Sequence, residues 1–330
     1  MTQRSGAVSR PVRAGIALAA SGALVLAGCD VQDEGDLTLA TGSTGGTYYP
    51  LGGEIAVLWS DDIEDVNVST QSTGASKDNM ELLDAGENEV VMAVNGTAAQ
   101  AVTGEGPFAD EPLDNPDEVV ALGNVYREVM QIVTTADTGI ESIEDLEGAR
   151  VEIGPPGSAT RTMATEILEV HGIDPDTDLA ETFDSDFGPA ATNLGDGVVD
   201  AAFGILGVPT GSLLELGTTS DIVMLDVVGD PLDELLGADE SLSTVEIPAD
   251  TYPGQDEPNE TVTNWATLYA TPDLDEDIAY DLVRVMYEES DRVQHDVAGD
   301  IQLETAIEGL GPIELHPGAE RYYEEQGLLD

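Results

Sequence analysis

The stretch that decides the fold is "LTLATGSTGGTYYPLGGEIAVLWSDDI", residues 37–63, followed by "VNVSTQST", residues 66–73. Residues 37–41 predict a strand, residues 48–63 carry apolar side chains at helical spacing, and residues 66–73 alternate as in a second strand. An uncharged turn rich in glycine and hydroxyl groups joins the first strand to the helix. A strand, a helix and a strand with short connections predict a parallel α/β sheet.

The same rhythm continues along the chain. Further strands are predicted at 90–94, 119–126, 128–135, 149–154, 200–205, 222–227 and 263–271, and helices at 76–87, 142–148, 160–172, 209–220, 275–293 and 318–327. Residues 103–118 and 243–255 are interpreted as irregular. This order predicts two α/β lobes joined by crossing strands, one lobe with residues 37–128 and 232–330 and the other with residues 129–231. Ligands of such sheets bind in the cleft beyond the carboxyl ends of the strands.

The amino-terminal residues predict export and a lipid anchor. Residues 1–28 have the basic and then apolar pattern of a signal peptide, which ends in "LAGC", a stretch that looks like a lipobox. Cys29 is the only cysteine, so an intramolecular disulfide is excluded and lipidation would account for the thiol. A transmembrane anchor is the alternative, although the apolar stretch is shorter than the roughly 20 residues that span a bilayer. After a short tether, residues 29–36, the folded chain is expected outside the cell, held on the outer face of the membrane.

The charge of the chain limits its partners. After the predicted leader there are seven basic residues against 67 acidic ones, a formal charge of −60. The acids are spread evenly and hydrophobic content is 41%, so the sequence predicts a folded protein with an acidic surface. Such a surface suits a halophilic protein in molar salt, where the screening length falls to about 3 Å. A nucleic-acid partner is excluded because phosphates need a basic face.

Three turns rich in glycine and hydroxyl groups are candidates for a ligand site. The first is the turn of residues 42–47, which precedes a helix whose free amides and dipole favour an anion. It lacks the Gly-Lys-Ser/Thr of a P-loop and the spacing of a dinucleotide fingerprint. It is therefore either a ligand-facing turn or a structural link between strand and helix.

The other two turns carry rare cations. In "GPPGSATRTMA", residues 154–164, Arg161 stands in the first helical turn, where the helix dipole disfavours a cation. It is expected to bind either an anionic ligand or a surface carboxylate. In "STQSTGASKDN", residues 69–79, Lys77 is either solvated or ligand-binding. Arg127 lies near a crossing strand, where a cleft position and a surface position are both open.

Signatures of catalysis and of metal binding are weak. The three histidines are far apart, and the sequence contains no Cys–His set and no Gly-x-Ser-x-Gly elbow, so we expect neither an enzyme nor a cofactor. Residues 174–186 begin like a calcium loop, but Leu179 stands where a turn glycine is needed. A solvated acidic loop is the better interpretation.

From residue 37 onward the chain resembles the TAXI proteins, the extracytoplasmic solute receptors associated with TRAP transporters. The resemblance is carried, in order, by "ATGSTGGTYYPLGG", "TGASKDNMELLDAGE", "DLEGARVEIGPPGSATR", "GDGVVDAAFGILGVPTG", "VEIPADTYPGQDE" and "LHPGAERYYEEQG". It implies a two-lobed periplasmic-binding-protein fold of type II that closes on a small organic anion, such as a dicarboxylate or an amino acid like glutamate. It also implies delivery of that solute to a TRAP-type membrane transporter subunit.

The resemblance also implies ligand-binding residues, position by position. These are Ser43, Thr44, Thr47, Tyr48, Ser72, Thr73, Ser76, Gly157, Ser158, Thr160 and Arg161, with Pro209 as a weaker member and Arg127 as a candidate local to this chain. Ala159 departs from the glycine that the family commonly shows. A lipid-anchored ligand sensor of the same fold, without a transporter partner, is the main alternative function, and a hydrolase or transferase on the same fold is a third.

Overall fold

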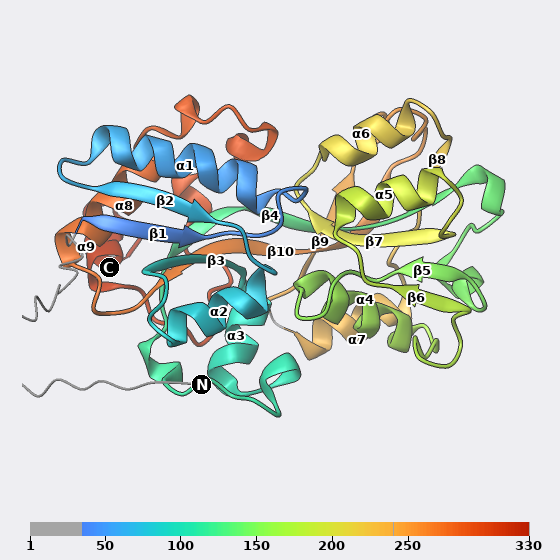
Figure 1. The fold of residues 1–330 in the computed structure, drawn as a ribbon, viewed down its shortest axis with the longest axis horizontal. Helices are drawn as coiled ribbons and strands as arrows, with labels where there is room; N and C mark the ends of the chain where they lie inside the picture. The colour runs from blue at the N-terminus through green and yellow to red at the C-terminus, as the bar shows by residue number, and fades with distance from the viewer. Residues whose placement is uncertain (1–34, 240, 330) are drawn as a thin grey trace, which may run out of the picture. The chain divides into compact units, whose positions relative to one another are not determined.

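The computed structural model describes residues 35–239 and 241–329. Within them, one mixed sheet runs in the order β2-β1-β3-β10-β4-β7-β5-β6, with β8 paired to β4 and β9 to β10 (Figure 1). The strands are β1 (Asp36–Ala40), β2 (Asn67–Gln71), β3 (Val90–Val94), β4 (Val120–Thr135), β5 (Arg150–Glu152), β6 (Glu181–Phe183), β7 (Ala201–Leu206), β8 (Ile222–Met224), β9 (Ser243–Ile247) and β10 (Asn259–Ala270).

The α-helices connect and cover these strands. They are α1 (Tyr48–Asp62), α2 (Ser76–Asp84), α3 (Asn95–Thr103), α4 (Ala159–Val170), α5 (Phe187–Gly195), α6 (Gly211–Gly217), α7 (Asp230–Ala238), α8 (Glu276–Glu288) and α9 (Pro317–Gln326). Short 3-10 turns occur between them. One of these, Ile143–Leu146, has a capping box, in which the side chains of Ser142 and Asp145 bond each other's backbone.

The sheet consists of two parallel groups joined by two long antiparallel strands. In the first group β1 pairs in parallel with β2 and β3, and in the second β5 pairs in parallel with β6 and β7. Strand β10 runs antiparallel to β3 and β4, and β4 runs antiparallel to β7. The predicted parallel α/β units and the crossing strands between them are therefore confirmed (Figure 1).

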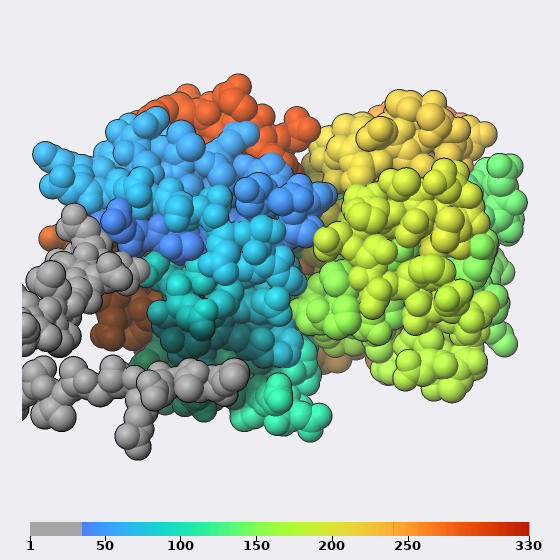
Figure 2. All heavy atoms as spheres, in the orientation of Figure 1, coloured from blue at the N-terminus to red at the C-terminus, as the bar shows by residue number. Residues whose placement is uncertain are grey.

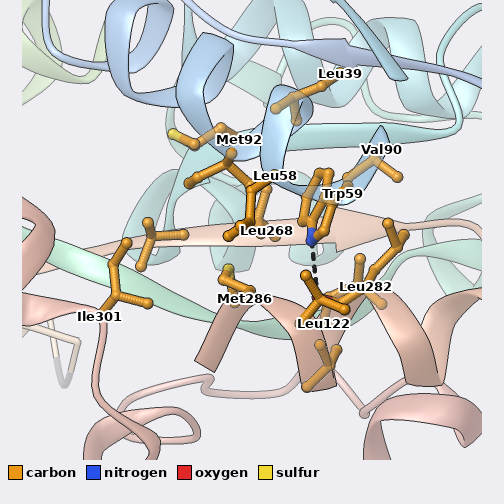
Figure 3. Close-up of a cluster of buried hydrophobic side chains, with 14 of the residues drawn as sticks. Leu39, Leu58, Trp59, Val90, Met92, Leu122, Leu268, Leu282, Met286 and Ile301 are labelled. Atoms are coloured by element: carbon orange, nitrogen blue, oxygen red, sulfur yellow. Dashed lines mark hydrogen bonds between the residues drawn. The ribbon is translucent and has the colours of Figure 1, made fainter. Parts of the chain in front are cut away.

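The core of the first group is built on the apolar face of α1. Leu51, Ile55 and Trp59 recur at helical spacing and are at most 1% exposed, so they form the buried stripe of an amphipathic helix. Trp59 Nε1–H donates to the backbone oxygen of Leu282 in α8 at 2.8 Å, which ties the helix to the carboxyl-terminal part of the chain (Figure 3).

The second group has its own apolar clusters. Ile167 and Leu168 of α4 pack with Phe203 of β7 in a cluster that also contains Leu232 and Leu235 of α7. By packing, α7 therefore belongs with β5–β7, although residue 232 begins the return segment of the predicted lobe division. The lobe boundaries themselves stay a prediction.

Some predicted elements were wrong. Residues 119–126 and 128–135 were expected to be separate strands, but β4 is one strand of 16 residues, because its pairing with β10 continues through Arg127 and Glu128. Residues 243–255 were expected to be irregular, yet they begin with β9, which pairs with β10. Helices α3, α5 and α7 and strand β6 were not predicted, since glycine, proline and short length weaken their periodic patterns.

Candidate functional site

A cavity of about 90 Å³ lies where the amino ends of α1, α2, α4 and α5 meet. Cavities that hold drug-sized ligands measure roughly 300–1,000 Å³, so this one suits a compact solute. Its lining comes from both sheet groups and consists of Gly42, Ser43, Gly46, Thr47, Tyr48, Gly74, Ala75, Ser76, Val94, Tyr126, Glu128, Gly154, Pro155, Ser158, Ala159, Thr160, Ser185, Asp186, Phe187, Phe203, Ile205 and Leu206.

Three of the four helix ends have no side-chain cap. The N-cap residues Thr47, Ala75 and Asp186 of α1, α2 and α5 make no capping hydrogen bond. Ser158 does cap α4, because its Oγ accepts from the Arg161 amide at 3.2 Å. Uncapped first-turn amides and the helix dipoles both attract negative charge. The backbone at these helix ends therefore contributes positive partial charge to the cavity wall.

Hydrogen bonds fix the first two turns against each other. Ser72 Oγ donates to the Gly42 carbonyl at 3.0 Å, and Thr73 Oγ1 donates to the Thr41 carbonyl at 2.9 Å. Ala75 then adopts a φ of +73°, which a residue with a Cβ rarely does, and its amide donates to Thr73 Oγ1 at 3.1 Å. Ser72 and Thr73 thus position the turn whose Ala75 faces the cavity, and they do not line it themselves.

One contact between the two sheet groups and one within the second group hold the residues that enclose the cavity. Thr47 Oγ1, before α1, accepts a hydrogen bond at 3.3 Å from the amide of Gly207, which follows β7. Thr160 Oγ1 accepts from the Ile205 amide at 3.1 Å, which fixes the start of α4 on β7. In the space-filling view the residues of the turn before α1 (blue) abut the second group (yellow-green) (Figure 2).

A buried carboxyl group also faces the cavity. Glu128 is only 3% exposed, and its Oε1 accepts a hydrogen bond from the Tyr126 hydroxyl at 2.7 Å. Its Oε2 is buried without a hydrogen-bond partner among the described residues. Burial raises the pKa of Glu128 to about 8, although the bond from Tyr126 opposes the rise. Glu128 therefore enters the cavity as a carboxyl group that favours its neutral form.

Tyr48 stands beside this carboxyl group. Its ring packs edge-on against the ring of Tyr126, with centroids 6.2 Å apart. Burial and the charge of Glu128 raise the pKa of Tyr48 well above its usual range. The Tyr48 hydroxyl lies close enough to Glu128 and Ser76 for both side chains to affect its pKa, yet among the described residues it makes no hydrogen bond of normal geometry. Two buried oxygens, Glu128 Oε2 and the Tyr48 hydroxyl, thus lack a hydrogen-bond partner among the described residues.

The structure brings six of the thirteen predicted binding residues to the cavity. They are Ser43, Thr47, Tyr48, Ser76, Ser158 and Thr160. Five others lie elsewhere: Thr44 is exposed, Ser72 and Thr73 hold the turn, Gly157 precedes the cap of α4 with a φ of +82°, and Pro209 follows a cis peptide bond after β7. As ligand-binding residues, all thirteen stay predictions.

The two candidate arginines do not line the cavity. The Arg127 guanidinium stacks 4.4 Å from the Trp265 ring centroid and lies 3.9 Å from the Glu308 carboxylate. Arg161 donates from its guanidinium to the Gly154 carbonyl at 3.2 Å, and no carboxylate of the described residues lies within ion-pair distance of it. Lys77 pairs with Glu81 on α2. No lysine, arginine or histidine is among the lining residues that the structure describes.

Sequence reasoning missed several lining residues. Glu128 and Tyr126 were passed over in favour of Arg127 between them, Ser185 and Asp186 fell in a loop interpreted as acidic and solvated, and Phe187 directly after it was not considered. For Glu128 a signal existed, since it is the single acid in the 16 residues of β4, and an acid within a long strand is rarely buried without a reason. For the loop there was none, because the α5 pattern is too short.

Some predictions fall outside the described residues. The signal peptide and Cys29 lie in residues 1–34, which the structure does not describe. Within residues 35–239 and 241–329, none of the helices has the length and apolar character needed to cross a membrane. Across the same ranges, no group of His, Cys, Asp and Glu side chains is arranged to hold a metal ion.

Solved structures of other proteins share this architecture. MatC from Rhodopseudomonas palustris with bound malate is 12% identical, with a TM-score of 0.55 over 89% of this chain and 97% of MatC. PhnD1 from Prochlorococcus marinus in complex with methylphosphonate is 10% identical, with a TM-score of 0.52 over 90% of this chain and 100% of PhnD1. A structure described as a periplasmic transporter is 12% identical, with a TM-score of 0.54 over 89% and 93%.

At these identities the likeness shows the fold, which is the type II periplasmic-binding-protein fold predicted from the sequence. Sequence similarity gives the family: residues 39–327 match the NMT1-like family, and the chain belongs to it.

Proposed function

We propose that this protein is an extracytoplasmic solute-binding receptor of the TAXI type, which captures a small carboxylated solute and delivers it to a TRAP-type transporter. The observation that carries the proposal is the meeting of four helix amino ends around one cavity. Each helix end attracts a nearby anion by about 0.3–1 kcal/mol, and more when partly buried. Four of them can hold a carboxylate without a basic side chain.

The lining supports binding rather than catalysis. Ser43, Ser76 and Thr160 bring hydroxyl groups to the helix ends, while Phe187 and Phe203 contribute apolar surface. Such a mixture orients a small polar solute and excludes water around it. The solved relatives of the same fold offer support, since MatC was seen with malate and PhnD1 with methylphosphonate, and both of these ligands are acids.

A ligand screen in molar KCl tests the proposal. Thermal unfolding is measured with acetate, succinate, malate, glycine, aspartate and glutamate, each raised until the shift saturates. A solute present at about 100 times its Kd stabilises the fold by about 2.7 kcal/mol, which corresponds to several degrees in Tm. If the protein unfolds cooperatively and none of these solutes raises its Tm, the carboxylate assignment is wrong.

A pair of neighbouring hydroxyls provides the matched control. Ser43 lines the cavity, whereas Thr44 is exposed outside it. Ser43→Ala should weaken binding of the best solute by about 2- to 10-fold, the value of one hydrogen bond, and Thr44→Ala should leave it unchanged. Equal effects of the two changes would place the solute elsewhere.

Transport and anchoring need experiments in cells. Deletion of the gene should abolish uptake of the radiolabelled solute, whereas unchanged uptake would favour a sensor. Cys29→Ala should remove a metabolically incorporated fatty acid from the protein and release it from the membrane fraction. Retention of the label in the variant would contradict lipidation at this residue.

A further inference from the structure

The cavity contains a pair of buried oxygens that the helix ends do not account for. Glu128 and Tyr48 both line it and are only 3% and 6% exposed, and neither Glu128 Oε2 nor the Tyr48 hydroxyl has a hydrogen-bond partner among the described residues. Buried polar groups are almost always satisfied, so a pair left open at a cavity points to a ligand. The question is whether the pair donates or accepts.

The hydrogen bond from Tyr126 decides which oxygen carries the proton. The Tyr126 hydroxyl donates to Glu128 Oε1 at 2.7 Å, so Oε1 is an acceptor. In the neutral acid the proton then lies on Oε2, the oxygen without a partner. An ionised Oε2 would instead be a buried charge without a cation, which is costly.

The groups around Glu128 favour the neutral acid. Tyr126 on its own strand and Tyr48 on α1 are neutral hydroxyls, and Asp186 at the start of α5 is a further carboxylate on the cavity wall. The neighbouring cation, Arg127, stacks on Trp265 outside the cavity. No neighbouring positive side chain therefore stabilises an ionised Glu128.

We propose that Glu128, as a neutral carboxylic acid, and Tyr48 form a pair of O–H donors that bind an acidic oxygen of the solute. This inference rests on the proposed function, and it adds the chemical class of group recognised at this end of the cavity. The solute presents an anionic or carbonyl oxygen here and not an ammonium group. A small acid should therefore bind better than the amino acid of the same skeleton.

The pair makes capture of the solute dependent on pH. Burial raises the pKa of Glu128 to about 8, so the donor is mostly neutral at pH 7 and mostly ionised at pH 9. An anionic solute binds poorly when Glu128 is ionised, so the apparent Kd of the solute should rise about tenfold between pH 7 and pH 9. An ammonium group held by an ionised Glu128 would produce the opposite trend.

Calorimetric titration with two matched pairs of solutes distinguishes a neutral Glu128 that donates to an acid from an ionised Glu128 that binds an ammonium group. Acetate is compared with glycine, and succinate with aspartate, at pH 7 and pH 9 in the same concentration of KCl. At both pH values every carboxylate group of these four solutes is ionised. We expect each acid to bind more tightly than its amino analogue, and its affinity to fall about tenfold at pH 9. Tighter binding of glycine and aspartate, or affinity that rises with pH, would overturn the proposal.

Variants at Glu128 and Tyr48 sharpen the outcome. Glu128→Gln keeps an N–H donor, so it should retain binding within about threefold at pH 7 and lose the fall at pH 9. Glu128→Leu and Tyr48→Phe each remove a donor and should weaken binding about 10-fold. Glu128→Gln that no longer binds the acids, or that keeps the pH dependence of the wild type, would contradict the donor role.

Infrared spectroscopy distinguishes failure of this inference from failure of the proposed function. Without any solute, the difference spectrum between wild type and Glu128→Gln at pH 7 should contain the C=O band of a protonated carboxyl group, and the band should vanish by pH 9. If none of the six solutes of the thermal screen binds, the proposed function fails, and the band alone decides whether Glu128 is a neutral donor. Absence of the band at pH 7 overturns the inference whatever binds.

Discussion

Replacement of Glu128 by glutamine should change how the stability of the fold depends on pH. The pKa of this carboxyl group is raised from the ordinary 4.5 to about 8 because it is buried. A group whose folded pKa is higher than its unfolded pKa stabilises the fold fully below the unfolded value, and that contribution is lost as pH rises through the folded value. The wild type should therefore lose stability relative to Glu128→Gln between pH 4.5 and pH 8.

The size of this effect follows from the two pKa values. One unit of pKa corresponds to about 1.4 kcal/mol, so the full difference of 3.5 units corresponds to about 5 kcal/mol. Between pH 6 and pH 9, a range in which so acidic a protein is convenient to handle, linkage gives about 2.7 kcal/mol. The free energy of unfolding of Glu128→Gln should gain that amount over the wild type across the range.

Urea unfolding in molar KCl, followed by tryptophan fluorescence, measures the difference. Glu64→Gln, at an exposed position of the first sheet group, removes the same charge from the surface and serves as the control. Subtracting the change in the free energy of unfolding of this control leaves the part that is due to burial of Glu128 and removes the part that is due to the loss of one negative charge. A difference between Glu128→Gln and wild type that stays constant from pH 6 to pH 9 would refute the reasoning.

Three further changes have definite expected outcomes. Trp59→Phe removes the bond to the Leu282 carbonyl and leaves a void, so urea unfolding should show a loss of about 1–3 kcal/mol. Burial, with two neighbouring carboxylates, raises the pKa of Glu166 to about 7, and Glu166→Gln should raise Tm more at pH 8 than at pH 6. In Gly207→Ala the new Cβ would lie 2.3 Å from Val297 Cγ1, so overpacking should cost about 1–3 kcal/mol.

Each of these has a control or a contrary outcome. A Cβ at Gly211 would meet open space, so Gly211→Ala should leave Tm close to that of the wild type. An equal loss in the alanine variants of Gly207 and Gly211 would contradict the role of the contact with Val297. An equal gain in Tm at both pH values would contradict the role of Glu166, and Trp59→Phe at full stability would contradict that of the Trp59 bond.

The local parts of the site could be predicted from the sequence. The turns before α1, α2 and α4 were found because glycine and hydroxyl residues at a junction of strand and helix are a short-range signal. The turns before α1 and α2 lie together because β1 and β2 are parallel neighbours. The turn before α4 follows β5 of the second group, which runs in the opposite direction, so it meets the first two turns from the other side of the cavity. The six predicted residues on the cavity wall all belong to these turns.

The long-range parts could not be predicted in this way. Arg127 was chosen as a ligand contact because cations are rare in this chain, but its neighbour Glu128 faces the cavity, since successive side chains of a strand point to opposite faces. Which face is buried depends on β10 and on Tyr48 of α1, and both are distant in the sequence. The residues of β4 alone therefore do not indicate which of its faces lies toward the cavity.

The place of β10 between β3 and β4 has a consequence for how the chain comes to be folded. Trp265 pairs with Arg127, and Ala266 with Val94, so the middle of the sheet joins residues well over a hundred positions apart. Such long-range pairing makes folding slow. Until the ribosome has passed Ala270, the first parallel group cannot complete its hydrogen-bonded edge, because β3 pairs with β10. The first parallel group should therefore stay incomplete during most of synthesis, and fragments that end before Asn259 should be open to proteolysis in that group.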